Sequence, residues 1–286
     1  MLHLNQLPTR LLLKLKDNNG MKLILSRKGF DSGYGGMPSP ILPDGTLLSM
    51  PIPTDDVVEY KNLTYNGQSY LDILKQLKPK FDKTTCHLDP DIRKGCIERT
   101  KDWIAAFGQA DAALSHLNNQ DVKVGDIFLF FGWFKQTEYD KNGKLRFVKN
   151  VPDLHIIYGY LQVGKVLYNW SDIKEMYWHP HADLRRKDDS LNAIYVASDK
   201  FIDTNLTGYG TFDYSKKLVL TKEGGSHRTH WLLPKCLEHK KITYHSENSY
   251  KEGYFKSACR GQEFVVECDK DILDWIKNII LTYSGH

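Results

Sequence analysis

The chain has 286 residues, of which 41% are hydrophobic and 26% are charged. This composition is ordinary for a soluble globular protein and excludes a disordered chain, a collagen, a coiled coil and a disulfide scaffold. No stretch approaches the roughly 20 apolar residues of a membrane helix, so we expect no membrane partner. The 39 Lys and Arg residues barely exceed the 35 Asp and Glu residues, which is untypical of a protein held on DNA mainly by phosphate contacts.

The five cysteines include no C-x-x-C pair, which favours reduced thiols in a cytoplasmic protein over a disulfide framework. A zinc site built on Cys236 and His239 would lack a second pair of ligands at a recognisable spacing. Composition and cysteine spacing identify no cofactor, and they leave metal dependence and oligomeric state open.

The first 20 residues lack the long apolar segment and the cleavage site of a secretory signal, and Asn18-Asn19-Gly20 is typical of a turn or linker. A buried strand then begins at Met21. We therefore expect residues 1–20 to be an extension, from an upstream start codon or as an added edge strand. Residues 21–286 are expected to form a single domain with subparts 21–120 and 121–286.

Further along the chain, residues 26–53 hold five Gly and five Pro, which excludes a helix and favours a long ordered loop. Amphipathic spacing predicts a short helix over residues 70–78 and two helices over 93–118 with a break at Gly108. Aromatic and β-branched runs predict strands at residues 126–134, 155–167, 192–198, 218–221 and 231–233. A closing helix over 270–283 completes an α+β fold, with a loop-rich N-terminal part and a helical middle packed on a β-rich half.

The glycine loop after the first strand is a candidate phosphate-binding segment, because glycines let backbone amides face an anion. Neither a dinucleotide-binding nor a Walker motif is present, so a structural turn is the alternative to a ligand-facing loop. The candidate ligand-binding residues of this segment are Arg27, Lys28, Ser32, Gly33, Tyr34 and Gly35, and Asp31 is a candidate catalytic residue.

The segment CHLDPDIR contains the sharpest polar cluster, formed by His87, Asp89 and Asp91. Alternate residues of an extended segment share a face, so one imidazole and two carboxylates would point the same way. Such a set is suited to binding a divalent metal or to acid–base catalysis. The alternative is that Asp-Pro-Asp caps a following helix, and the two roles are compatible.

Other polar and aromatic residues have weaker signals. His179-Pro180-His181 offers two imidazoles for metal ligation, with a surface loop as the alternative. Trp133 is a candidate stacking platform for a base, with core packing as the alternative. His155 is a candidate pocket residue, with a hydrogen-bonded core histidine as the alternative. Arg228 and Trp231 are candidates for clamping an anionic or planar ligand, against an ordinary hairpin turn.

Two segments, residues 21–53 and 86–134, resemble the third type of nucleotide modification-associated domain, and the likeness extends over most of residues 21–286. Proteins of this family occur in bacteria and phages beside DNA-modification and restriction systems, and the resemblance implies no settled reaction or catalytic set. A fainter likeness concerns Val124-Gly125-Asp126 and the strand HIIYGYLQVGKV. It is similar to the small β-barrels of the PUA, ASCH and EVE group, which implies a barrel in the β-rich half.

These observations lead to the hypothesis of a protein that binds a nucleotide or an exposed or modified DNA base in an aromatic and polar pocket. Arg27 and Lys28 would contact phosphate, Trp133 would stack, and Asp31 would act with His87, Asp89 or Asp91. The hypothesis requires Asp31 and His87 to line one cleft. The alternatives are a non-catalytic reader of modified bases and a partner protein of a phage-defence or restriction system.

Overall fold

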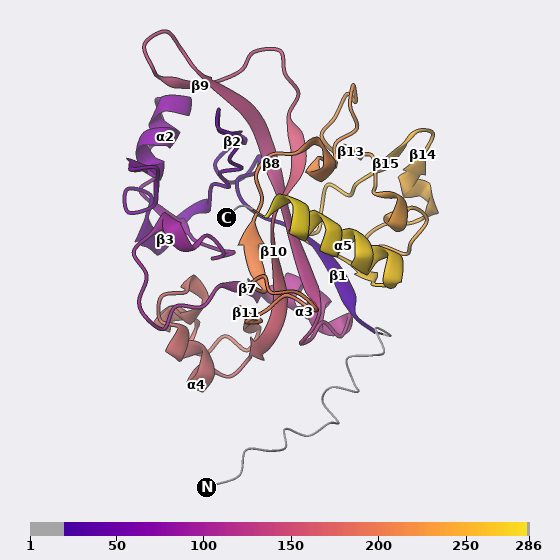
Figure 1. Ribbon diagram of the computed structural model, residues 1–286. Coiled ribbons are helices and arrows are strands. Elements are labelled where there is room, and N and C mark those ends of the chain that lie inside the picture. The colour runs from indigo at the N-terminus through magenta and orange to yellow at the C-terminus, as the bar shows by residue number, and fades with distance from the viewer. Residues whose placement is uncertain (1–19, 285–286) are drawn as a thin grey trace, which may run out of the picture.

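One large mixed β-sheet forms the centre of the molecule in the computed structural model, which describes residues 20–284 (Figure 1). Its main path follows the order β16 (Glu263–Glu267), β1 (Lys22–Arg27), β8 (Ile127–Tyr139), β10 (Leu154–Leu167), β11 (Asn192–Ala197) and β7 (Ala106–Ala110). The short strands that pair with β8 or β10 are β2 (Ser39–Ile41), β9 (Leu145–Phe147) and β12 (Tyr209–Thr211). β1 runs parallel to β8, whereas the other pairs on the main path are antiparallel.

The sheet curls until its two edge strands come close to each other. Gln109 on β7 donates a hydrogen bond from Nε2 to Glu263 Oε1 on β16 over 2.7 Å, and both side chains are buried. No backbone pairing joins β7 to β16 within residues 20–284. The predicted α+β class is therefore confirmed, but the expected barrel is not closed in this part of the chain, because polar side chains bridge the gap between the edges instead of backbone hydrogen bonds.

The main hydrophobic core lies on both faces of this sheet. β8 and β10 are buried along most of their length, as expected for strands that are covered on both sides. The helix α5 (Lys270–Tyr283) packs its buried isoleucines onto this core, and Asp269 caps it by accepting the N–H of Ile272 at 3.0 Å. The predicted closing helix is thus confirmed.

A second hydrophobic core lies within the loop-rich N-terminal part. Its regular elements are β3 (Ile52–Glu59), β4 (Thr64–Tyr65), β5 (Gln68–Ser69), α2 (Tyr70–Leu77) and β6 (Thr85–His87), with β3 paired to β6. Phe30, Tyr60 and Phe81 pack in contact, with ring centroids between 5.5 and 6.4 Å apart. Ser69 caps α2 by accepting the N–H of Asp72, which confirms the predicted helix.

The helical pair predicted over residues 93–118 is wrong in its first half. Lys94–Cys96 forms only a 3-10 turn, residues 106–110 form strand β7, and α3 (Asp111–Asn119) is the helix that remains. Phe107 pairs with Tyr195 of β11, and their rings stack with centroids 5.9 Å apart. Tertiary pairing with β11 therefore overrides the local helical spacing.

The rest of the described chain consists of short elements. A small sheet joins β13 (His230–Trp231), β15 (Tyr254–Lys256) and β14 (Tyr250–Lys251), and α4 (Trp170–Ile173) is a single turn. The other 3-10 segments are Lys174–Met176, Pro180–Ala182, Leu184–Arg186, Lys216–Leu218, Lys235–Leu237 and Glu247–Ser249. Among residues 20–284, no helix has the length and apolar character that a membrane crossing requires. The expected N-terminal extension lies, apart from Gly20, outside the described residues.

His155 and Trp231 are core residues that bond to each other. Trp231 donates its Nε1–H to His155 Nδ1 at 3.0 Å, and both side chains are buried against Phe131. Burial lowers the pKa of His155 well below its ordinary value of 6.5, and the charges of Arg27 and Arg228 lower it further. His155 is therefore neutral in the folded protein.

This buried histidine predicts a loss of stability in acid. Below pH 6.5 the unfolded chain binds a proton at His155 that the folded protein excludes, so the free energy of unfolding falls by about 1.4 kcal/mol per pH unit from this group. In urea unfolding from neutral to acid pH, His155→Gln should show a shallower pH dependence than the wild type. His227→Gln, at an exposed histidine, should keep the wild-type slope, and equal slopes for all three proteins would contradict the prediction.

Asp91 is held inside the protein by a buried ion pair. It bonds to Arg99 through both carboxylate oxygens, and Oδ2 also accepts the Nε1–H of Trp103 at 2.8 Å. The Asp91 side chain is 2% exposed. This carboxylate is saturated by partners within the fold.

Removing the negative charge of Asp91 should therefore destabilise the protein. Asp91→Asn leaves the Arg99 guanidinium buried without its counter-ion, a change that costs about 3–5 kcal/mol in comparable pairs. Urea unfolding at neutral pH measures this loss. A matched control is Asp140→Asn, at an exposed turn of the β8–β9 hairpin, which should change stability by much less; wild-type stability for Asp91→Asn would refute the structural role.

Candidate functional site

A cleft of about 800 Å³ opens where the C-terminal ends of β1 and β6 meet the start of α3. We call it the main cleft, and its walls are formed by residues 27–29, 31, 34, 52, 87, 89, 109–113, 181, 186, 244, 259, 261 and 262. Asp31 and His87 both line it. The glycine loop that contains Asp31 and the segment that contains His87 therefore meet in one cleft, as the hypothesis from the sequence required.

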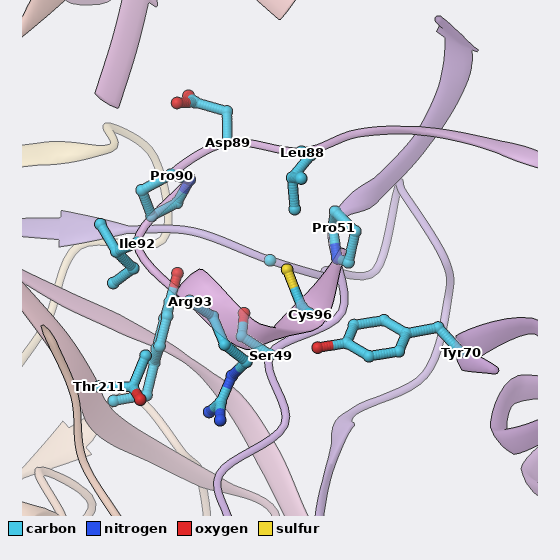
Figure 2. Close-up of a pocket in the computed structure, with 12 residues that line it drawn as sticks. Ser49, Pro51, Tyr70, Leu88, Asp89, Pro90, Ile92, Arg93, Cys96 and Thr211 are labelled. Atoms are coloured by element: carbon cyan, nitrogen blue, oxygen red, sulfur yellow. The ribbon is translucent and has the colours of Figure 1, made fainter. Parts of the chain in front are cut away.

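A much smaller cavity lies behind Asp89, between the two hydrophobic cores. It has a volume of about 30 Å³, and Ser49, Tyr70 and Arg93 contribute polar atoms to its wall (Figure 2). This space accommodates a water molecule but not an organic ligand. We therefore assign the functional site to the main cleft, which shares Asp89 with the small cavity.

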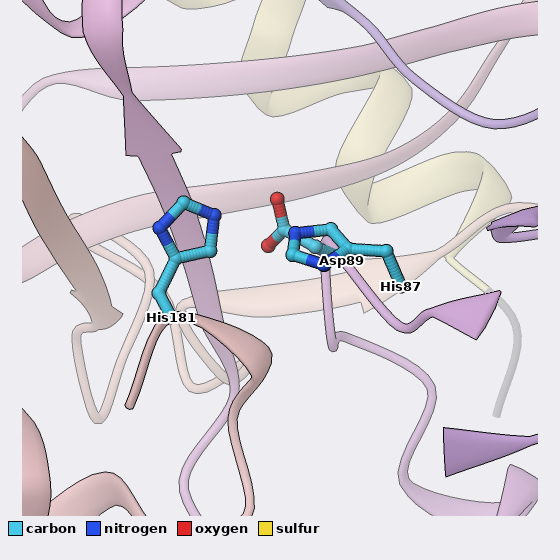
Figure 3. A group of neighbouring side chains, drawn as sticks. All are labelled: His87, Asp89 and His181. Atoms are coloured by element: carbon cyan, nitrogen blue, oxygen red, sulfur yellow. The ribbon is translucent and has the colours of Figure 1, made fainter. Parts of the chain in front are cut away.

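His87, Asp89 and His181 form a compact cluster in the wall of the main cleft, which we call the triad. Figure 3 shows the three side chains turned toward one another, with Asp89 between the two imidazoles. One potential metal-ligating atom from each residue lies within 4.8 Å of the other two. His87 ends strand β6, whereas His181 lies in the distant 3-10 turn Pro180–Ala182, so only the tertiary fold unites them.

Each member of the triad is held from behind by a partner. The Nδ1 atom of His87 lies 2.8 Å from Asp56 Oδ2, and the Nδ1 atom of His181 lies 2.6 Å from Asn192 Oδ1. Asp89 Oδ1 accepts the backbone N–H of Gly108 at 2.8 Å and lies 3.3 Å from Nε2 of His179. The three side chains are therefore fixed in orientation before any ligand binds.

Gly108 is the residue that allows His181 to approach. A Cβ atom built at this position would lie 2.2 Å from Cδ2 of the His181 ring, far inside van der Waals contact. The glycine that predicted a break between two helices thus lies within strand β7, where the packing of His181 requires it.

The electrostatics of the triad favour an ionised carboxylate next to neutral imidazole. Burial alone raises the pKa of Asp89, but contact with His179 and the proximity of His181 and His87 outweigh it and lower the pKa to about 2. Burial also lowers the pKa of His181, to about 3, although the Asp89 charge opposes this shift. At neutral pH the cluster consequently contains a carboxylate anion and a neutral His181 whose free ring nitrogen can bind a metal ion.

The two basic residues after β1 differ in what they contact. Arg27 donates to the backbone carbonyls of Ala258 and Cys259, at 2.5 and 2.9 Å, and thereby holds the loop that forms one wall of the cleft. Lys28 Nζ lies 2.9 Å from Glu263 Oε1 and 4.5 Å from the centre of the Phe107 ring. Arg27 is thus a positioning residue for the wall, and Lys28 belongs to a buried ion pair at the base of the cleft.

Asp31 organises the glycine loop as well as lining the cleft. Its Oδ1 accepts the backbone N–H groups of Gly33 and Tyr34, at 2.7 and 2.6 Å. Gly35 has φ +84°, and a Cβ there would lie 2.3 Å from the Phe30 ring, so this turn requires glycine. The turn positions Tyr34, whose side chain is 53% exposed, at the cleft.

Several predicted site residues lie outside the main cleft. Trp133 is covered by the guanidinium of Arg228, 4.3 Å from its ring centre, and Arg228 also donates to Ser32 at 3.2 Å. His155 and Trp231 are buried together in the core. The remaining residues that do not line the cleft are Ser32, Gly33, Gly35 and Asp91.

The structure also adds residues that the sequence interpretation omitted. Tyr244, 52% exposed, and Arg186 line the cleft, and Asp56 and Asn192 orient the two histidines. The spacing His179-Pro180-His181 was the only local signal for His181, and it gave no indication of Asp89 as the neighbour. No local pattern distinguishes Tyr244 from the other exposed tyrosines.

Comparison with known proteins gives one family and no individual relative. No curated protein and no solved structure matches the chain significantly. Residues 22–267 match the family described as nucleotide modification associated domain 3, a match that includes every residue of the main cleft and of the triad. The chain therefore belongs to the nucleotide modification associated domain 3 family.

Proposed function

We propose that the protein binds a nucleotide, or one base exposed from a DNA strand, in the main cleft and acts on it chemically. The observation that carries this proposal is the convergence of the Asp31 loop, the triad and two exposed tyrosines on one cleft. The family description, which associates the domain with nucleotide modification, supports the same class of ligand.

The size and charge of the cleft favour a small ligand. Its volume of about 800 Å³ falls within the range of about 300–1,000 Å³ that is usual for small-molecule sites. Three cationic side chains, Arg27, Lys28 and Arg186, are matched by the carboxylates of Asp31, Asp89 and Asp111. A balanced lining suits a mononucleotide or one flipped base better than a long stretch of duplex, which needs a cationic surface.

The two ends of such a ligand have suitable contacts in the cleft. Tyr34 and Tyr244 offer exposed rings on which a base can stack. The first turn of α3 lines the cleft with Ala112 and Ala113, whose amides lie at the positive end of the helix dipole, and Arg186 lines the same cleft. A phosphate group bound there would leave the base beside the tyrosines.

The triad supports a role in proton transfer. The carboxylate of Asp56 fixes the proton of His87 on Nδ1, which leaves Nε2 able to accept a proton from a bound ligand or a water molecule. Asp89 supplies a second acceptor in the same wall of the cleft. We therefore assign His87 and Asp89 as the reacting groups and Asp31 as a residue that shapes the ligand-binding loop.

A non-catalytic reader of modified bases is the second candidate. A reader needs an aromatic pocket that recognises the base, and it has no need for ionised carboxylates beside the ligand. Asp89 and its histidine neighbours in the main cleft favour the enzyme. A partner protein of a defence system would use a different surface, and nothing in the main cleft argues for it.

The proposal predicts that stacking contributes to nucleotide affinity. Tyr34→Ala and Tyr244→Ala should each weaken binding of nucleoside 5′-monophosphates about 10- to 100-fold, because one base–aromatic stack is worth about 1–3 kcal/mol. Isothermal titration calorimetry measures this change. Tyr139→Ala is the matched control, because Tyr139 is 59% exposed but does not line the cleft; equal affinities for all variants would contradict the assignment of the cleft.

A second prediction concerns the reaction. Expression of the wild-type protein in a host cell should change the nucleoside composition of its DNA, as measured by mass spectrometry, and Asp89→Asn should abolish that change because the variant loses the reactive carboxylate. Asp140→Asn, at an exposed turn, should behave like the wild type. Unchanged nucleosides together with intact nucleotide binding would favour the reader.

A further inference from the structure

Hydrogen-bond acceptors converge at the triad of His87, Asp89 and His181. The Asp56 carboxylate has no proton to donate, so the hydrogen bond to His87 Nδ1 requires the ring proton on Nδ1. Asn192 donates its amide N–H to the His181 carbonyl oxygen at 2.8 Å, and its Oδ1 therefore accepts from His181 Nδ1. In its neutral form, each imidazole is therefore left with an unprotonated Nε2.

These acceptors have no donor among themselves. No hydrogen bond joins the three side chains of the triad to one another, all three of which lie in the described part of the chain, although their ligating atoms lie within 4.8 Å of each other. Two imidazole lone pairs beside an anionic oxygen repel one another unless a cation or a proton donor lies between them. We propose that one divalent transition-metal ion binds between His87, Asp89 and His181.

The arrangement requires little adjustment to bind such an ion. Ligands that lie about 2.0–2.2 Å from one ion are about 3–4 Å from each other. The observed separations, none above 4.8 Å, therefore need to close by at most about 1–2 Å, which small shifts of the three side chains supply. Two nitrogens and one carboxylate oxygen suit zinc or iron, whereas magnesium requires mainly oxygen ligands.

The surroundings of the triad are those of a metal centre rather than of a simple polar cluster. Metal-binding histidines ordinarily donate their second N–H to a carboxylate or carbonyl group, as His87 does to Asp56 and His181 to Asn192. The ligating carboxylate is usually hydrogen-bonded as well, and Asp89 accepts from the N–H of Gly108.

Three protein ligands leave coordination positions open, and all three ligands line the main cleft. Open positions are typical of catalytic rather than structural metal centres. With the ion bound, the lone pairs of His87 and Asp89 serve as its ligands, so the ion would replace them as the reacting group and act as a Lewis acid on the bound ligand or on water. This role rests on the proposed function and deepens it, whereas metal binding itself is independent of it.

The experiment is a titration of tag-free, chelator-treated protein with Zn²⁺ by calorimetry and with Co²⁺ by visible absorption. The wild type should bind one ion per chain, with Co²⁺ absorption bands characteristic of nitrogen ligands, and Mg²⁺ should not compete. His87→Ala and His181→Ala should lower the affinity by more than ~100-fold, and the second-sphere change Asp56→Asn by about 10- to 100-fold. Gly108→Ala changes no metal ligand, but it should still weaken metal binding because the added Cβ collides with the His181 ring.

The controls are His227→Ala, at an exposed histidine, and Asp31→Asn, at a carboxylate of the same cleft outside the triad. Both should retain wild-type metal affinity. Circular dichroism establishes which variants fold. If a variant of a metal ligand fails to fold, Asp56→Asn provides the test instead. Absence of binding by the wild type, or binding that the triad variants leave unchanged, overturns the inference. Nucleotide titration of the same samples is scored separately: a protein that binds nucleotides but no metal loses only this inference, and one that binds metal but no nucleotide loses only the proposed function.

Discussion

The backbone N–H of Gly108 is the contact on which the whole site depends. It holds Asp89 Oδ1 at 2.8 Å, and the absence of a side chain at this position admits the ring of His181. Gly108 lies in β7, which is fixed in the sheet by its pairing with β11. One strand residue therefore connects the rigid sheet to two segments that come from distant parts of the sequence. Any side chain at position 108 would separate His181 from Asp89, even though neither residue had been changed.

The charges around the cleft explain why this region needs such rigid support. Asp89 is buried as an anion next to three histidines, His87, His179 and His181, and Lys28 is buried against Glu263 at the base of the cleft. Buried charges cost several kcal/mol of desolvation, which their partners only partly return. The large hydrophobic core on β8 and β10 supplies the stability that permits this arrangement. The bond between Gln109 and Glu263 adds a further link, since it holds the two edges of the sheet together next to Lys28.

Local patterns in the sequence predict a large part of the fold and a smaller part of the site. Amphipathic spacing identifies α2 and α5, and aromatic runs identify β8, β10 and β11, because burial of those residues is decided within one element. The turn at Asp31 and the pairing of His87 with Asp89 are also local. Tertiary contacts alone bring three residues to the site, and the residues next to them in sequence do not indicate those contacts. The three are His181, Asn192 and Tyr244. The sequence also misleads at Gly108. A glycine within a helical pattern predicts a helix break, whereas the structure shows a strand residue that makes room for the ring of His181.

The contrast between Asp89 and Asp91 gives the physical criterion that separates a reactive carboxylate from a structural one. Both are acidic residues of the same short segment, and both were expected to face one way. Asp91 meets Arg99 and Trp103, which use both of its oxygens. Asp89 instead meets the Gly108 N–H and His179 Nε2 through Oδ1 alone. The Nδ1 atoms of His87 and His181 face Asp56 and Asn192, so the acceptor capacity of Asp89 Oδ2 is not exhausted within the fold. Burial and charge are similar at the two positions. What differs is which oxygens the donors reach. Both oxygens of Asp91 are bonded, whereas the contacts of Asp89 meet only Oδ1. Asp89 Oδ2 has no hydrogen-bond partner among the described residues and is the oxygen available to a ligand.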